Sequence, residues 1–151
     1  MVFLCSVVDF STDNQTTFNP LIAPYSMKYA IDKQEKYTIL TLEEDNLNSL
    51  VAPAIKSEFI MLHTEGVPNL ILNLSDVKFV DSSGLSAILT ANRIWKGGGG
   101  SFVLAGVKHP SVKRLIEISR LDSILTLVPT VEESIEYVFM EEIERELGAE
   151  A

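Results

Sequence analysis

The spacing of apolar residues changes several times along the chain, and each change marks the boundary of an expected element. An apolar run of strand length at 70–74 favours a strand that is buried on both faces, and the segment 101–105 predicts a further strand. Two further apolar segments, 29–31 and 37–42, flank a polar stretch and together predict a hairpin. Segment 124–128 predicts the last strand.

Apolar residues three and four positions apart predict four helices. Their expected ranges are about 50–64, from near Ser83 to the glycines at 97–100, 110–118, and from Thr130 to about Leu147. The last helix opens with Thr130-Val-Glu-Glu133, which is typical of a capping box. Because strands and helices alternate after the hairpin, we predict an α/β fold. It has a mixed sheet of about four to five strands, an N-terminal hairpin followed by parallel crossovers, and about four covering helices.

A single compact domain over residues 27–151 is expected, with residues 1–26 outside it. The chain has 151 residues, of which 46% are hydrophobic, and this suits one domain with a sizeable core. Residues 1–26 contain no Lys or Arg and lack the positive start, long apolar core and cleavage site of a signal peptide. We interpret them as an N-terminal extension, either disordered or the result of an over-predicted start.

Charge and cysteine content narrow the classes of partner. The net charge of −9 argues against nucleic acid, which needs clustered Lys and Arg, and suits either solubility or a basic protein partner. Cys5 is the single cysteine of the sequence and cannot form an internal disulfide, which fits a reducing compartment. No apolar stretch approaches the roughly 20 residues needed to cross a bilayer. We therefore expect a cytoplasmic protein with no membrane partner.

A polar cluster stands where an apolar segment gives way to a helix. Residues 77–80, Phe79 included, are expected to return the chain to the interior, and Asp81, Ser82 and Ser83 follow at the helix start. Side-chain oxygens there accept hydrogen bonds from free N–H groups of the first turn, worth about 1 kcal/mol. The helix dipole favours negative charge at the same place, and a phosphate would add about −1.5 to −2 charge. The serine pair can thus serve as a cap and as a phosphorylation site.

The sequence Val80-Asp-Ser-Ser-Gly-Leu85 follows an Asn-Leu-Ser strand end at 73–75 and precedes a helix, a Gly-rich turn and a strand. In this setting it resembles the STAS domain of bacterial anti-sigma factor antagonists. The resemblance covers residues 27–151, and the family's order of elements agrees with the order predicted above. In such proteins the second serine of the motif is phosphorylated, which implies Ser83 here rather than Ser82.

The resemblance implies a partner switch. The unmodified protein would bind an anti-sigma factor that is itself a serine kinase, and a sigma factor would thereby be released. Phosphorylation of Ser83 would weaken this binding, and a protein phosphatase would restore it. The implied binding surface consists of Asn48, Asp81, Ser82, Ser83, Gly84 and Leu85. The family commonly has Asp after Leu47, whereas Asn48 keeps the capping capacity without the charge.

Other interpretations use the same residues. Asp81, Ser82 and Ser83 could form a cap without any modification, or the domain could be an unphosphorylated STAS scaffold or regulatory module in another assembly. An aspartate after a buried strand is also where a receiver domain keeps its phospho-acceptor. However, a receiver carries a lysine after a late strand, and 124–129 contains none.

Signals for an enzyme or a metal site are weak. The glycines at 97–100 follow a predicted helix and lack the Lys-Ser/Thr of a phosphate loop. His63 and His109 have no cysteine or second histidine at ligand spacing. Ser83-Gly84 does not supply a nucleophile elbow. We therefore expect no catalytic residues, no cofactor and no metal.

Overall fold

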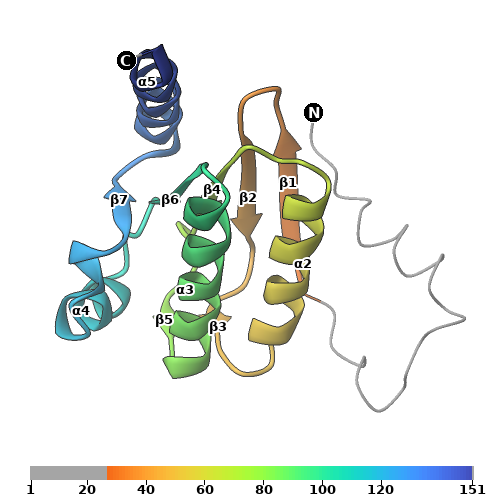
Figure 1. Cartoon of the computed structure of the whole chain (residues 1–151). Coiled ribbons are helices and arrows are strands. Elements are labelled where there is room, and N and C mark those ends of the chain that lie inside the picture. Colours follow the sequence, from red (N-terminus) through yellow and green to blue (C-terminus); the bar gives the residue numbers. More distant parts are fainter. Residues whose placement is uncertain (1–26, 151) are drawn as a thin grey trace, which may run out of the picture.

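The computed structural model describes residues 27–150, so the expected N-terminal extension and Cys5 lie outside the described residues. A five-stranded sheet in the order β1-β2-β4-β6-β7 forms the centre of the domain (Figure 1). Its strands are β1 (Tyr29–Lys33), β2 (Thr38–Leu42), β4 (Asn69–Asn73), β6 (Ser101–Ala105) and β7 (Thr126–Val128). β1 pairs antiparallel with β2, and the remaining neighbours pair in parallel.

Helices cover both faces of this sheet. They are α2 (Ala52–Thr64), α3 (Ser82–Gly97), α4 (Pro110–Ile118), the short 3-10 helix η2 (Leu121–Ser123) and α5 (Val131–Glu150). Figure 1 shows α2 and α3 side by side on one face, and α5 apart from them near the upper end of the sheet. The mixed sheet with its opening hairpin and parallel crossovers confirms the predicted fold class. Within residues 27–150 no helix has both the length and the apolar character needed to span a bilayer.

The central strands separate two apolar clusters. Leu70 and Leu72 of β4 belong to the cluster beneath α2, α3 and α4, whereas Ile71 belongs to the cluster that includes Val138 of α5. All three β4 side chains are fully buried, as expected for successive residues that point to opposite, covered faces. The prediction of a strand buried on both faces is therefore confirmed.

A second, two-stranded parallel sheet joins the loop after β2 to the segment before α3. Its strands are β3 (Asn46–Leu47) and β5 (Phe79–Val80), with Leu47 opposite Val80. Val77 is buried as predicted, but the expectation for Phe79 is wrong because its side chain is 54% exposed. β5 does not enter the main sheet, so Phe79 points outward and its ring lies 5.3 Å from that of His109.

The last strand starts two residues later than predicted, whereas the last helix starts at the predicted place. β7 begins at Thr126, because Ile124 follows the 3-10 turn η2 and is half exposed. The start of α5 confirms one half of the predicted capping box, because the Glu133 N–H donates to Thr130 Oγ1 at 3.1 Å. The Glu133 carboxylate accepts from the Thr130 hydroxyl at 3.1 Å, whereas the reciprocal bond of a capping box would come from the Thr130 N–H.

Hydrogen bonds anchor the later turns of α5 at the amino ends of β4 and β6. Asn69 is fully buried; its Oδ1 accepts from the Ser101 N–H at 2.8 Å and from the Arg145 guanidinium at 3.0 Å. Its Nδ2 donates to the Glu142 carboxylate at 2.8 Å and to the Lys36 carbonyl at 2.7 Å. One amide side chain thus joins two strands, a hairpin turn and a helix.

Candidate functional site

The predicted serine cluster stands at the start of α3, and Asp81 caps this helix. Asp81 has an extended backbone, and its Oδ1 accepts a hydrogen bond from the Gly84 N–H at 3.0 Å. This is the expected geometry of a side-chain N-cap, which satisfies one of the free donors of the first turn. Ser82 and Ser83 therefore occupy the first two helical positions, and neither is the capping residue.

Gly84 lets the helix start approach β3 closely. A β-carbon on Gly84 would lie 2.3 Å from the Leu47 carbonyl oxygen and 2.8 Å from side-chain atoms of Leu47 and Val80. The same Leu47 carbonyl accepts a hydrogen bond from the Asp81 N–H at 3.2 Å. The motif glycine is thus required by packing, since only a residue without a side chain fits against this backbone.

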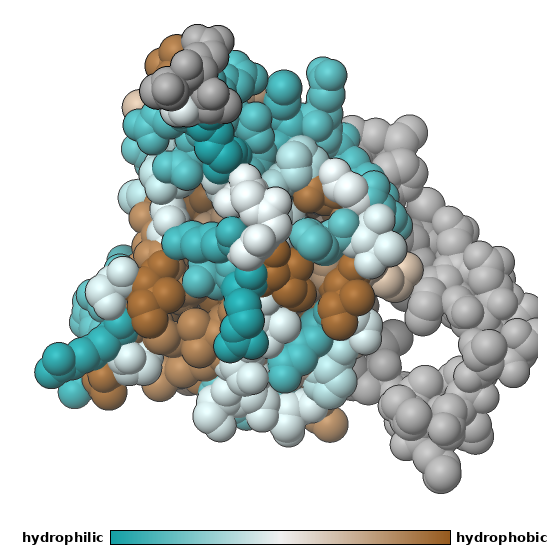
Figure 2. Space-filling view, viewed as in Figure 1, coloured by the Kyte–Doolittle hydropathy of each residue, from teal (hydrophilic) through white to brown (hydrophobic). Residues whose placement is uncertain are grey.

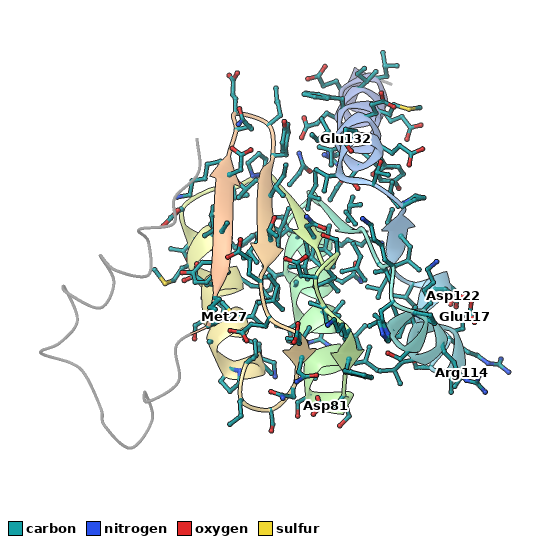
Figure 3. All side chains as sticks on the ribbon, turned by 180° about the vertical axis from the view of Figure 1, so that it is seen from behind. Met27, Asp81, Arg114, Glu117, Asp122 and Glu132 are labelled. Atoms are coloured by element: carbon teal, nitrogen blue, oxygen red, sulfur yellow. The ribbon has the colours of Figure 1, made fainter. Side chains whose placement is uncertain are left out.

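The two serines differ in exposure. The Ser82 side chain is exposed, whereas Ser83 is half-buried. Both line an open groove of about 300 Å³ between the first turns of α2 and α3, together with Ser49, Ala52, Pro53, Lys56 and Ser86. In the view from behind, Asp81 lies at the lower end of the molecule, where α3 begins (Figure 3). Figure 2 shows a mainly white to teal surface at this end, which agrees with the small and polar lining of the groove.

Lys56 reaches across this groove from α2. Its Nζ lies 3.4 Å from Ser86 Oγ, one turn beyond Ser82 and Ser83 on α3. The sequence analysis did not single out Lys56, Ser49 or Ser86. Helical spacing placed Lys56 on α2 and Ser86 on α3, but no signal in the sequence said which faces of these helices would meet.

The remaining predicted site residues lie nearby with different roles. The Asn48 Oδ1 accepts from the Leu50 N–H at 3.0 Å, so Asn48 caps the turn that precedes α2. The capping capacity of Asn48 is therefore used in this turn, since α2 begins only at Ala52 and its N-cap residue Val51 makes no side-chain bond. Leu85 is partly buried and packs against the core beneath α3.

Apolar side chains flank the serine end at two points. Leu50, in the turn before α2, is 64% exposed, and Phe79 in β5 is 54% exposed. Both precede elements that carry site residues: Leu50 comes just before α2, and Phe79 lies two residues before Asp81. Neither side chain lines the polar groove, and the Phe79 ring lies against His109, so each is a separate exposed apolar group near the serine end of the chain.

A larger groove of about 570 Å³ lies at the carboxyl ends of the parallel strands and contains none of the predicted site residues. It is lined by residues of 43–45, 75–78 and 108–110. His109 in this groove is the N-cap residue of α4 and bonds to Ser111, while His63 packs edge-on against Trp95. Among residues 27–150 no group of three or more His, Cys, Asp or Glu side chains could hold a metal ion.

The protein is a small α/β domain with a five-stranded sheet and a separate parallel strand pair. Its serine cluster stands at the capped start of α3. A model of the STAS domain matches residues 28–134, which is more than half of the chain. The chain therefore belongs to the STAS domain family, as the sequence motif predicted.

Solved structures support the same assignment. A Thermotoga maritima protein described as an anti-sigma factor antagonist is 26% identical with a TM-score of 0.65, covering 73% of this chain and 93% of that one. The phosphorylated form of the Bacillus cell fate determinant SpoIIAA is 21% identical with a TM-score of 0.58, covering 73% and 98%. A sulfate transporter family protein from Wolinella succinogenes shares the fold at 15% identity and a TM-score of 0.62, covering 73% and 90%.

Proposed function

We propose that this protein is a cytoplasmic anti-sigma factor antagonist that is switched by phosphorylation of Ser83. In its unmodified form it binds an anti-sigma factor with serine kinase activity, and the sigma factor held by that protein is released. A phosphate on Ser83 weakens the complex, and a protein phosphatase reverses the modification. The domain is a kinase substrate and a binding module with no active site of its own.

The observation that carries this proposal is the placement of Ser83 at an accessible helix start in a STAS domain. Asp81 and Gly84 fix that helix start, through the cap bond of 3.0 Å and the close approach to Leu47. A half-buried Ser83 between them has a defined position and still opens onto a groove. The similarity to an anti-sigma factor antagonist supports this assignment, and the fold is shared with SpoIIAA in its phosphorylated form.

The modification is an ordinary phosphoryl transfer. Ser83 Oγ attacks the γ-phosphorus of ATP held by the kinase, the bond to the β,γ-bridging oxygen breaks, and ADP leaves. The hydroxyl proton passes to a base of the kinase. The product carries about −1.5 to −2 charge where a neutral hydroxyl stood.

The effect on binding follows from the surroundings of Ser83. A partner that covers the groove and the exposed Leu50 and Phe79 would have to remove water from the phosphate, which is costly for a charged group. The helix start itself tolerates the negative charge, because the dipole of α3 favours it there. The switch therefore works by repulsion and desolvation at the interface and needs no refolding of the domain.

Binding of Ser83 variants to a candidate anti-sigma kinase, such as one encoded beside this chain, tests the proposal. We expect Ser83→Ala to bind like the unmodified protein and Ser83→Asp to bind at least tenfold more weakly, a loss of about 1.4 kcal/mol. Ser123→Asp adds the same charge on the exposed turn η2 and is the matched control, with unchanged binding expected. Equal affinities for the Ala and Asp variants at Ser83 would contradict the switch.

Site-resolved mass spectrometry after incubation with ATP and the kinase provides the direct measurement. A single phosphate on Ser83 is the expected result. An unmodified chain beside an active kinase would favour the alternative, a STAS domain that acts as an unphosphorylated scaffold or regulatory module in another assembly. The observation that favours this alternative is that a sulfate transporter family protein has the same fold.

A further inference from the structure

We propose that Lys56 of α2 binds the phosphate of phosphorylated Ser83, so that the modified site forms an ion pair between α2 and α3 within one chain. The inference rests on the proposed function in one respect, namely that Ser83 is the residue that carries a phosphate. It adds a second residue to the switch, one that lies outside the sequence motif.

The first argument is the reach of the lysine. Its Nζ already lies 3.4 Å from Ser86 Oγ, on the far side of the groove. Ser86 lies three residues after Ser83, and helical residues at this spacing are neighbours with β-carbons about 5–6 Å apart. A small rotation of the flexible lysine stem would therefore carry its ammonium group from Ser86 to a phosphate on Ser83.

The second argument is that Lys56 is the only charged residue among the seven that line this groove. Within residues 27–150 it forms no ion pair, and its one side-chain hydrogen bond is the long contact to Ser86. Lys96, by comparison, donates to the Ile124 carbonyl at 3.2 Å. Among the described residues, Lys56 therefore has no carboxylate partner from which a phosphate on Ser83 would have to displace it.

The third argument concerns chemistry. A phosphoserine offers three strong acceptor oxygens, and a lysine ammonium offers three donors, so the pair forms charge-assisted hydrogen bonds. The groove is open to water, which limits the strength of such a pair. The dipole of α3 favours negative charge at this helix start, and Lys56 adds the one side-chain cation among the residues that line the groove. Held by Lys56, the phosphate lies against α2 and is less accessible to a phosphatase.

The experiment uses the full chain with phosphoserine inserted at position 83 during translation, so that no kinase is needed. The probe is the phosphate itself, whose second ionisation, ordinarily near pH 6, is followed by ³¹P NMR. We expect Lys56→Gln to raise the midpoint of this titration by about half a pH unit, the size typical of an exposed ion pair. Lys56→Arg should keep the low midpoint, because it retains the charge.

Lys96→Gln is the matched control, since it removes one positive charge from α3 away from the groove, and its midpoint should equal that of the parent. Identical midpoints in the parent, Lys56→Gln and Lys56→Arg chains would overturn the proposal. Equal upward shifts in Lys56→Gln and Lys96→Gln would also overturn it, because they would reflect net charge alone. A kinase that fails to modify Ser83 would contradict the proposed function but would leave this result unaffected.

Discussion

The carbonyl oxygen of Leu47 lies 2.3 Å from the point where a β-carbon on Gly84 would stand. Leu47 belongs to β3, before α2, and Gly84 to the first turn of α3, so two segments that are distant in sequence meet at the serine end. The same carbonyl accepts the Asp81 N–H at 3.2 Å. The position of Ser83 therefore depends on β3 as much as on the helix that carries it.

Substitution of Gly84 should test this dependence. Gly84→Ala forces the backbone of Leu47 away, and overpacking of this kind typically costs about 1–3 kcal/mol of unfolding free energy. Gly97→Ala is the control, since a β-carbon there meets no atom within 4 Å, and it should stabilise by up to about 1 kcal/mol. Urea unfolding measures both variants, and a neutral Gly84→Ala would show that β3 can shift freely.

The cap on α3 gives a second prediction. Asp81→Ala removes the acceptor of the Gly84 N–H and should lower the unfolding free energy by about 1 kcal/mol. Asp81→Asn keeps an acceptor oxygen and should retain most of that stability. If both variants lost the same amount in chemical denaturation, the carboxylate charge rather than the hydrogen bond would be the source of the effect.

The anchor of α5 predicts a dependence on pH. The hydrogen bond from Asn69, followed by that from Arg145, lowers the pKa of Glu142 below its ordinary value. A lowered pKa in the folded state contributes stability above the ordinary pKa of a glutamate, and this stability is lost as the pH falls through the ordinary and then the lowered value. Glu142→Gln should therefore lose stability at pH 7 and show a shallower decline in acid.

Thermal unfolding between pH 7 and pH 3 measures this difference. Glu146→Gln, a change at an exposed glutamate of the same helix, is the control and should follow the parent curve closely. If the stability of the parent and of Glu142→Gln declined in parallel with falling pH, ionisation of this carboxylate would not be coupled to folding.

A buried amide on α3 offers a stabilising change. Asn92 is 8% exposed, and its Oδ1 has no hydrogen-bond partner among the residues that the structure describes. A buried acceptor without a partner costs free energy, so Asn92→Leu should raise the unfolding free energy by about 1 kcal/mol. Asn92→Asp, with nearly the same shape and a charge, should be strongly destabilising. A loss of stability in the Leu variant, measured by urea unfolding, would mean that the polar group has a partner in solution.

Periodicity was sufficient for the main elements, because each of them buries a continuous apolar face. The run at 70–74 is continuous because its side chains point alternately into two apolar clusters, and the helical spacing after Ser83 marks the face of α3 that packs on one of them. The STAS resemblance likewise rested on a short motif whose glycine proves to be required by packing. The family and fold were therefore predictable from the sequence.

Features that depend on contacts across the sequence were not predictable. β3 and β5 have two residues each, too few for a period, and they pair only because the loop after β2 returns to the start of α3. Phe79 was expected inside because it is apolar, yet the strand that carries it is not part of the main sheet. Lys56 became a site candidate only when the packing of α2 against α3 was known.

Because α5 is anchored at the amino ends of β4 and β6, it offers an attachment point for binding experiments that lies away from the serine end. Asp81 and the α5 residue Glu132 lie toward opposite ends of the molecule (Figure 3). A tag or biosensor support joined after α5 would therefore leave the serine end facing solution. Protein immobilised in this orientation would present every copy of the groove in the same way, so a weakened signal from a Ser83 variant would report on the interface and not on obstruction by the support.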